Sequence, residues 1–459
     1  FIGVTYFEVV KHAFLPAIIS YIALFYISHL EALKLNLKGM DENDIPKLKK
    51  TFFEGIHFLV PIFVLIYLLV YMRLTASYSI FFATITLIIV NLLNKIFKEK
   101  NFKNALIYWY NQTVVGFEKG ALNMVSVGIA IATAGIIVGA VGSTGLSTNL
   151  IIVIESIAKD NVIILLFLTI ILCLLLGMGL PTTANYVVVA SLMATVLVDV
   201  GNASGFIFPL IAVHLFVFYF GLMADVTPPV GLASYAAAAI SGGDPLRTGA
   251  QAFWYSLRTG ILPIVFLFNS ELLLIGIESI WHGLMVIATS LIGILVFTSA
   301  TQGWFINKLR WYEIVIFLII SISLLSPEFI LNKFYPKYNY LSIEEINKKQ
   351  FDYNKEIRIK ITRLTEYGER YKLFVIEKNS FDENFSLDDY GMSLVVEDNK
   401  TIIDTLKWNG IAKKSGLDMG DIINEFKIEN QNRPKKEIIY PIALILLSIF
   451  GYLNIRRRI

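Results

Sequence analysis

The sequence is poor in charge and has almost no cysteine. Only 16% of its 459 residues are charged, and 56% are hydrophobic. Soluble proteins average about 25% charged residues, so this balance excludes an ordinary soluble enzyme. Cys173 is the single cysteine, which excludes an intramolecular disulfide and a cysteine-based metal cluster. A net charge of +3 gives no sign of a nucleic-acid partner, and we expect none.

Catalytic motifs are also missing. The five histidines form no His-Glu-x-x-His motif, and no serine stands in a Gly-x-Ser-Gly context. An intramembrane protease of the metal or serine type therefore lacks its reacting groups. We expect a protein that is not an enzyme and that holds no cofactor.

The charges that are present are concentrated near the C-terminus. Almost half of the 39 Lys and Arg residues lie between Lys333 and Lys436, so the rest of the chain is strongly apolar. This predicts an all-α polytopic membrane protein with a small α+β domain. The expected parts are a membrane domain at 1–280, two additional transmembrane helices at 281–332, a soluble domain at 333–436 and a last transmembrane helix at 437–459.

Eleven apolar stretches are candidate membrane spans, because a helix needs about 20 apolar residues to cross a bilayer. They are 14–30, 55–72, 78–97, 121–141, 161–176, 186–200, 206–223, 255–277, 281–299, 311–326 and 438–455. Alternating the spans places 17 Lys and Arg residues on one face and three, Lys11, Arg73 and Lys159, on the other. Positive loops mark the cytoplasmic side. The soluble domain then lies in the periplasm.

A first break interrupts the apolar sequence at Gly177-Met178-Gly179-Leu180-Pro181-Thr182-Thr183-Ala184-Asn185. Two glycines and a proline prevent a continuous helix, and lipid tolerates such backbone only where protein or a wet cavity surrounds it. No charge occurs from Asn161 to Leu197, which favours a re-entrant hairpin over residues 161–200. An extramembrane loop between two short helices is the alternative.

A second break lies at Gly221-Leu222-Met223-Ala224-Asp225-Val226-Thr227-Pro228-Pro229-Val230-Gly231. Adjacent prolines remove two backbone donors, so nearby carbonyls lose their helical partners. Freed carbonyls beside a carboxylate and a hydroxyl form a hard-oxygen site suited to a small cation. Asp225 is therefore a candidate functional residue, and a helix cap is its structural alternative. His214 on the same segment is expected to be a packing residue.

An internal similarity suggests an inverted repeat. Lys11-His12-Ala13-Phe14-Leu15-Pro16-Ala17-Ile18 is similar to Arg258-Thr259-Gly260-Ile261-Leu262-Pro263-Ile264-Val265. The charge assignment orients the two helices oppositely, as inverted-repeat transporters require. The first copy of the two breaks should then lie upstream of Phe1.

Three segments of the chain resemble the large membrane (permease) subunit of tripartite ATP-independent periplasmic (TRAP) transporters. They are Gly177 to Tyr186, His214 to Gly221 and Asp225 to Tyr235. The loop after the first helix is similar to the class with fused small and large subunits. The resemblance covers about residues 1–280 and implies an N-terminally incomplete chain. It implies a sodium-driven elevator transporter of organic anions (carboxylates) in the bacterial inner membrane, in contact with lipid. A periplasmic substrate-binding protein and a small membrane subunit, fused upstream, are the implied partners.

The resemblance also implies a site between the two breaks. Its substrate- and ion-binding residues would be Gly177, Gly179, Pro181, Thr182, Thr183, Asn185, Asp225, Thr227, Pro228 and Pro229. Thr182, Thr183, Asp225 and Thr227 would hold sodium, partly through backbone carbonyls.

The C-terminal region differs in pattern. Ile357 to Ile361 and Tyr371 to Val375 alternate apolar and polar residues and predict half-exposed strands. Asn409 to Ile423 is similar to the PDZ segment in which a strand enters a short helix and leaves through a Gly-Asp turn. A PDZ-like domain without a ligand is the simpler interpretation. For the whole chain, a channel and a non-transporting scaffold remain alternatives to a carrier.

Overall fold

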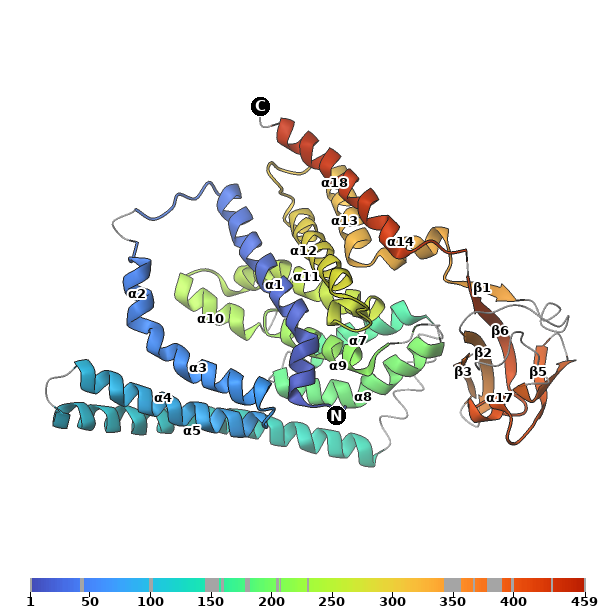
Figure 1. Cartoon of the computed structure of the whole chain (residues 1–459), viewed down its shortest axis with the longest axis horizontal. Coiled ribbons are helices and arrows are strands. Elements are labelled where there is room, and N and C mark those ends of the chain that lie inside the picture. Colours follow the sequence, from blue (N-terminus) through green and yellow to red (C-terminus); the bar gives the residue numbers. More distant parts are fainter. Residues whose placement is uncertain are drawn as a thin grey trace.

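The predicted fold class, a mostly helical membrane protein with a small α+β domain, is confirmed (Figure 1). The structure is a computed structural model. It describes residues 2–41, 45–98, 102–144, 157, 161–177, 182–203, 206, 208–228, 231–341, 356–365, 368–377, 390–397, 400–430 and 432–457.

The helices follow one another in a simple order. They are α1 (Tyr6–Lys34), α2 (Leu48–Gly55), η1 (Ile56–Phe58), α3 (Leu59–Ile66), η2 (Tyr67–Tyr71), α4 (Ala76–Lys98), α5 (Phe102–Ser143), α7 (Val162–Gly177), α8 (Thr182–Ala203), α9 (Leu210–Ala224), α10 (Leu232–Ser241), α11 (Pro245–Phe268), η3 (Ser270–Leu273), α12 (Ile280–Gln302), α13 (Trp311–Leu325), α14 (Pro327–Phe334), α17 (Ile411–Lys414), η4 (Lys436–Ile438) and α18 (Ile439–Arg456).

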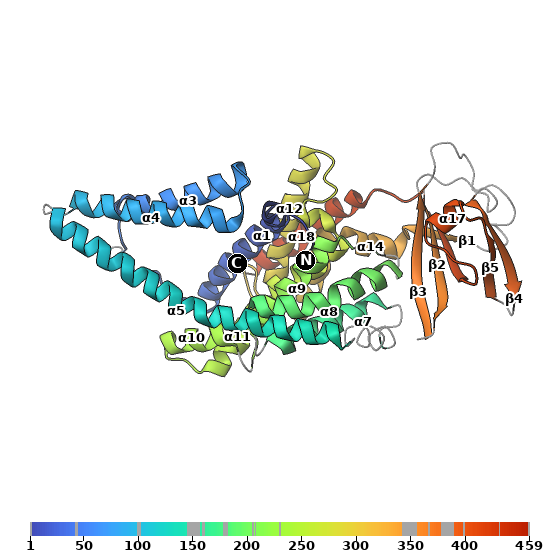
Figure 2. The same ribbon diagram turned by 90° about the horizontal axis from the view of Figure 1, so that it is seen from below.

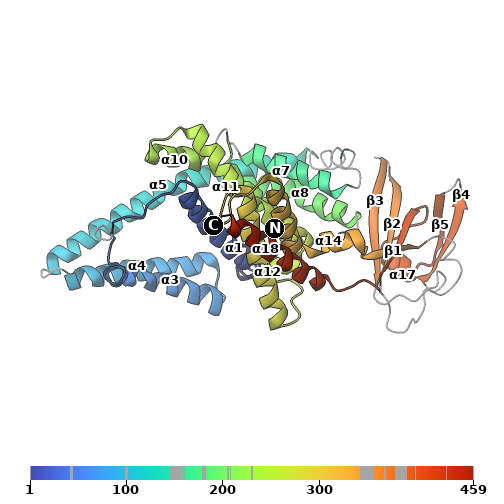
Figure 3. The same ribbon diagram turned by 90° about the horizontal axis from the view of Figure 1, so that it is seen from above.

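Six helical segments in the described residues are long and apolar enough to cross a membrane, or seven if the bent pair α13–α14 counts as one. Segments α3, α4 and α5 extend to one side of the molecule, and the strands lie at the opposite side (Figures 2 and 3). The apolar side chains along α3 and α4 are largely exposed. Such surfaces need lipid or another protein to cover them.

The main core surrounds α9. Twelve of the 15 residues of α9 are buried, and the helix packs against α7, α8 and α11. A helix that is apolar on all sides is a central helix, and α9 has this pattern. The core therefore fixes the ends of α7, α8 and α9 relative to one another.

Contacts between helices define two ends of the bundle. The Tyr26 hydroxyl lies 3.0 Å from the Ser299 hydroxyl, and His12 Nδ1 lies 2.7 Å from the Leu273 carbonyl oxygen. Helices α1 and α12 therefore run in the same direction. Ser20 Oγ lies 3.2 Å from Thr259 Oγ1, and Leu273, which follows α11, lies at the earlier residue His12, so α11 runs opposite to α1. This is the relative orientation that the internal similarity requires.

The last helix, α18, runs from one end to the other. Near its start Lys436 Nζ lies 2.5 Å from Glu271 Oε1, beside η3. Near its end Arg457 pairs with Glu313 of α13, and the Asn454 side chain accepts a hydrogen bond from Asn307 N–H. We call the end with Arg456 and Arg457 the basic end and the end with η3 the sheet-side end.

The predicted span at 255–277 is wrong in its bounds. Helix α11 begins earlier because Asp244 caps it, accepting a hydrogen bond from Arg247 N–H at 2.8 Å, with Pro245 in the first turn. It ends at Phe268, where the Asn269 side chain donates to the Leu325 carbonyl, 2.9 Å away. The predicted span at 121–141 is only the second part of α5, which has 42 residues.

The C-terminal sheet has six strands. They are β1 (Tyr338–Leu341), β2 (Glu356–Thr365), β3 (Gly368–Glu377), β4 (Met392–Glu397), β5 (Lys400–Leu406) and β6 (Ile422–Glu429). The order is β3-β2-β6-β5-β4 with β1 also on β6, and every described pairing is antiparallel. Strand β5 leads to α17 and then to β6, as the sequence predicts for 409–423. A PDZ-like fold stays a prediction.

The alternation of apolar and polar residues predicts that β2 is half-exposed, and this prediction is wrong. Ile357, Ile359 and Ile361 are buried in the core of the domain. The polar residues between them are buried too: Arg358 is 5% exposed and Lys360 is 9% exposed. Strand β1 and the membrane helices cover this second face, since Tyr338 stacks on Arg358 and β3 contacts α8.

An ion-pair cluster holds the end of β2 to the turn before β6. Arg363 Nη2 lies 2.6 Å from Asp421 Oδ2, and its Nη1 lies 3.1 Å from Asp418 Oδ2. Lys413 also pairs with Asp418. The side chain of Asp421 is 1% exposed, so its charge depends on Arg363. Hydrogen bonding to Lys413 and the nearby Arg363 charge lower the pKa of Asp418.

Replacing this arginine should destabilise the domain. Arg363→Ala leaves the buried Asp421 carboxylate without its cation, which costs about 3–5 kcal/mol of unfolding free energy. In the full chain, hydrogen exchange of β2 and β6 should accelerate, whereas Lys400→Ala, at an exposed position that begins β5, should change nothing. Unchanged exchange in Arg363→Ala would show that the cluster carries no stability.

The lowered pKa of Asp418 adds stability that is present above its unfolded pKa, about 3.9, and is lost as the pH falls through the folded pKa.

Candidate substrate and ion site

The described ends of the two sequence breaks lie close together: Gly177 of the first break approaches Ala224 of the second. The hairpin is formed by α7 and α8, which pack against each other and against α9. Residues 178–181 at its tip lie outside the described residues, and so do residues 229 and 230. The predicted site residues Gly179, Pro181 and Pro229 are therefore not placed.

A close backbone approach joins the end of α7 to the end of α9. A Cβ on Gly177 would lie 2.3 Å from the Cβ of Ala224 and 2.5 Å from Asn185 Nδ2. A Cβ on Gly221 would lie 3.4 Å from Asn185 Nδ2. Only glycine at 177 permits this approach without movement. Small residues at helix contacts in membranes allow backbones to come this close.

Asn185 is at the centre of this contact. Its side chain is fully buried, and Nδ2 donates to the Cys173 carbonyl at 2.9 Å, which ties α8 to α7. Its Oδ1 is buried and accepts no hydrogen bond from any residue that the structure describes. A buried amide oxygen without a donor is costly, so a cation or a water at this point would stabilise it.

The break after α9 is a turn in which the carbonyls from Leu222 to Thr227 all accept hydrogen bonds, so the prediction that carbonyls here are left without partners is wrong. Asp225 is the C-cap residue of α9, and the Thr227 hydroxyl donates to the Met223 carbonyl at 2.6 Å. The Asp225 carbonyl accepts from Ala233 N–H at 3.2 Å, which ties the break to α10. On the other side, Pro228 packs against Gly249 of α11. The break is therefore held between α10 and α11.

The carboxylate of Asp225 does not act as a helix cap in this structure. Its side chain is half-buried and forms no hydrogen bond or ion pair with a described residue. A negative charge at the C-terminus of a helix is unfavourable, because the helix dipole is negative there. A cation beside Asp225 would offset both the negative carboxylate and the negative dipole end of α9, and the cap and ion-binding roles of Asp225 both stay predictions.

Thr182, Thr183 and His214 lie in different surroundings. The backbone of Thr182, at the start of α8, lies beside Gly221, where its carbonyl oxygen is 4.0 Å from the position of a Cβ. Thr183 is exposed and hydrogen-bonds to no residue in the described ranges. His214 is a packing residue, as expected: it is 7% exposed, and its Nδ1 lies 3.0 Å from the Tyr186 hydroxyl.

The arrangement can attract a small cation. Helices α7 and α9 both end at the Gly177–Ala224 contact, so their negative dipole ends converge beside Asp225. The described residues contain no group of three or more His, Cys, Asp or Glu side chains that could hold a transition metal. Carbonyls, hydroxyls and one carboxylate are ligands for a hard, weakly bound ion instead.

Sequence reasoning missed the contribution of Gly221 and Ala224 to the close approach. They are spaced i, i+3, which is not the i, i+4 spacing of the small-xxx-small pattern in membrane helices, so the sequence contained no signal for the pair. The carbonyl of Cys173, which orients Asn185, had no signal in the sequence.

Comparison with known families identifies both parts of the chain. The model for the tripartite ATP-independent periplasmic transporter, DctM component, matches residues 1–281. A model described as a domain of unknown function, DUF3394, matches residues 283–459. No curated protein and no solved structure matched the chain. The first model covers more than half of the sequence, so the chain belongs to the DctM family of TRAP transporter permeases and carries a C-terminal DUF3394 domain.

Proposed function

We propose that this permease is driven by sodium and carries small organic anions, carboxylates above all. The supporting observation is the junction of the hairpin with the α9 break. Asp225, the Thr227 hydroxyl and the ends of α7 and α9 gather oxygen atoms and negative dipole ends around one point. Sodium would bind there, partly through backbone carbonyls, and would neutralise Asp225.

The N-termini of two helices favour binding of the substrate anion. Helices α8 and α10 begin at the same two breaks, and the N-terminus of a helix attracts negative groups. A carboxylate of the substrate would approach these N-termini next to the bound sodium. Sodium binding would thereby favour anion binding, which is what coupling requires.

The proposed mechanism needs partners and motion. The DctM family works with a periplasmic binding protein and a small membrane subunit, and we propose that this chain receives its anion from such a binding protein in the bacterial inner membrane. We propose that the hairpin and α9 move together as the elevator, because α7, α8 and α9 pack directly against one another. We propose no catalytic activity and no cofactor other than the coupling ion.

Uptake into proteoliposomes tests this function. The protein, together with a small membrane subunit and a periplasmic binding protein, should accumulate labelled succinate or a related carboxylate when sodium is higher outside. Replacing sodium with choline should abolish accumulation. A channel would show flux that does not saturate and does not need the binding protein, and a scaffold would show none.

The structure also supports a periplasmic position for the strand domain. Arg456 and Arg457 mark the basic end, and the domain precedes α18 at the opposite, sheet-side end. Positive residues remain in the cytoplasm. Protease added to spheroplasts should therefore cut near Lys348 and Lys349, which lie outside the described residues, and should spare the loop at 35–47. Protection of the domain until lysis would reverse this topology.

A further inference from the structure

Two short segments of chain join the strand domain to the helices, and we call them the neck. They are residues 335–337, between α14 and β1, and residues 432–435, between β6 and η4. Arg433 ties one segment to the other: its Nη2 donates to Asn332 Oδ1 at 2.7 Å, and its Nε donates to the Tyr335 carbonyl at 3.2 Å. These bonds restrict how far the strand domain can rotate relative to α14.

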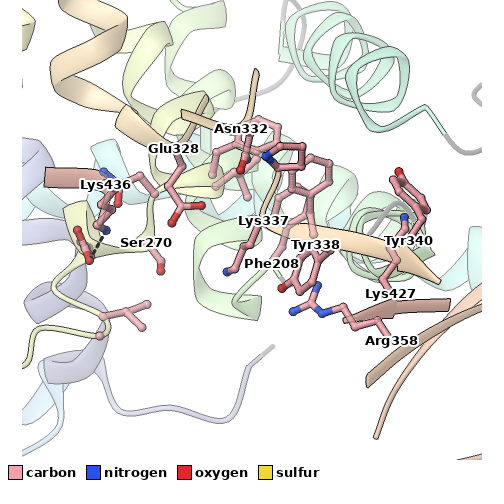
Figure 4. Close-up of a pocket in the computed structure, with 18 residues that line it drawn as sticks. Phe208, Ser270, Glu328, Asn332, Lys337, Tyr338, Tyr340, Arg358, Lys427 and Lys436 are labelled. Atoms are coloured by element: carbon pink, nitrogen blue, oxygen red, sulfur yellow. Dashed lines mark ion pairs between the residues drawn. The ribbon is translucent and has the colours of Figure 1, made fainter. Parts of the chain in front are cut away.

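Further contacts fix the neck at both of its ends. On the side of the sheet, Asn430 Nδ2 donates to the Pro336 carbonyl at 3.1 Å. On the side of the helices, Lys436 Nζ lies 2.5 Å from Glu271 Oε1, the pair that a dashed line marks in Figure 4. The neck therefore connects the strand domain firmly to α14 and η3.

Beside the neck, two cavities separate the strand domain from the helices. One has a volume of about 500 Å³ and lies between Ser270 on the helical side and Tyr338 on the strand side (Figure 4). The other has a volume of about 810 Å³ and lies between Val162, where α7 begins, and Lys360 of β2. The apolar cores of the hairpin and of the strand domain share no residue in the described ranges. The strand domain can thus separate from the helices without losing its own core.

Strand β3 nevertheless reaches the hairpin, because it packs against α8. The neck attaches the strand domain to a different group of helices: α14 follows α13, η4 precedes α18, and α12, α13 and α18 share a core of their own. The β3–α8 contact therefore connects the hairpin to helices outside it. If the hairpin moves and these helices do not, the contact must open before the hairpin can travel.

We infer that the strand domain is a stop, which holds the hairpin in the position seen in this structure, and that the neck determines how firmly it holds. The inference rests on the proposed function, because only a hairpin that moves needs a stop. The domain slows transport by restraining α8, and a looser neck allows the β3–α8 contact to open more often. This gives the DUF3394 domain a regulatory role in the permease.

Hydrogen exchange of the full chain in nanodiscs tests the restraint directly. In Arg433→Ala, exchange in α8 should accelerate about threefold or more, because local opening becomes less costly when a neighbouring element is released. Exchange in β2 and β6 should stay native, which shows that the strand domain remains folded. If it does not, Asn430→Ala decides the question, because it removes only the side-chain bond to Pro336.

Arg456→Ala is the matched control for the exchange experiment. Arg456 is an exposed arginine of α18 and forms no hydrogen bond or ion pair with a residue that the structure describes. Its replacement should leave exchange in α8 native. Native exchange in α8 when the neck is loosened, or an equal acceleration in Arg456→Ala, would overturn the inference.

Uptake into proteoliposomes provides the second measurement. The initial rate of Arg433→Ala should exceed the native rate by about threefold or more, since each lost hydrogen bond weakens the restraint several-fold. Native or slower uptake together with faster exchange in α8 would show that the contact does not limit transport, which overturns the stop. If the native protein carries no succinate, the proposed function fails separately, and exchange alone then decides whether the domain holds the hairpin.

Discussion

Gly177→Ala should lower uptake at least about tenfold while the protein remains in the membrane. The added methyl group would lie 2.3 Å from Ala224 Cβ and 2.5 Å from Asn185 Nδ2, so the hairpin must move away from α9. Overpacking of this kind costs about 1–3 kcal/mol, and the displacement would separate the groups that bind sodium. Initial uptake rates, normalised to the amount of protein in the membrane, measure the effect.

Two glycine variants serve as controls for this prediction. Gly116→Ala in α5 adds the same methyl group where nothing lies within 4 Å, and its uptake should stay native. Gly221→Ala should stay close to native, because its methyl group would meet Asn185 Nδ2 at 3.4 Å, an ordinary van der Waals contact. Native uptake by Gly177→Ala would mean that the close approach has no part in transport.

Asp225→Asn should raise the sodium concentration for half-maximal uptake by about tenfold or more. The change keeps the shape of the side chain and removes its negative charge, and about 1.4 kcal/mol of lost cation stabilisation corresponds to tenfold. Thr227→Ala should shift the same quantity less, since it removes a neutral hydroxyl. Uptake measured over a sodium series at saturating substrate provides the value.

Asp244→Asn is the matched control for the aspartate. It removes the same charge from the N-cap of α11, where asparagine caps as well as aspartate does. Its sodium dependence should be native. An equal shift in both variants would indicate a general effect of surface charge, and no shift in either would leave Asp225 without a role in coupling.

The two breaks could be read from the sequence because they violate a strong rule. Glycine and proline within uncharged apolar sequence need surrounding protein, so Gly177 and Pro228 stand out without any structure. The contact between the two breaks could not be predicted from the sequence in this way. The approach of Gly177 to Ala224 joins residues far apart in the chain, and only the packing around α9 determines it.

In the C-terminal region the sequence predicts the strand but not the burial of its polar residues. The alternation in β2 correctly predicts a strand, but it predicts that Arg358 and Lys360 face water. The membrane helices and β1 cover that face, and local periodicity contains no information about such a neighbour. The pairing of Glu271 with Lys436 was equally invisible, because it depends on where α18 begins in space.

The most direct test of the central claim is the effect of sodium on the melting temperature of the purified protein. A cation that binds the folded hairpin junction and not the unfolded chain stabilises the fold by RT ln(1 + [cation]/Kd). Sodium, but not potassium or choline at equal ionic strength, should raise the Tm of native protein and should have no such effect on the Asp225→Asn/Thr227→Ala double variant. An identical sodium response in the native protein and the double variant would contradict the account.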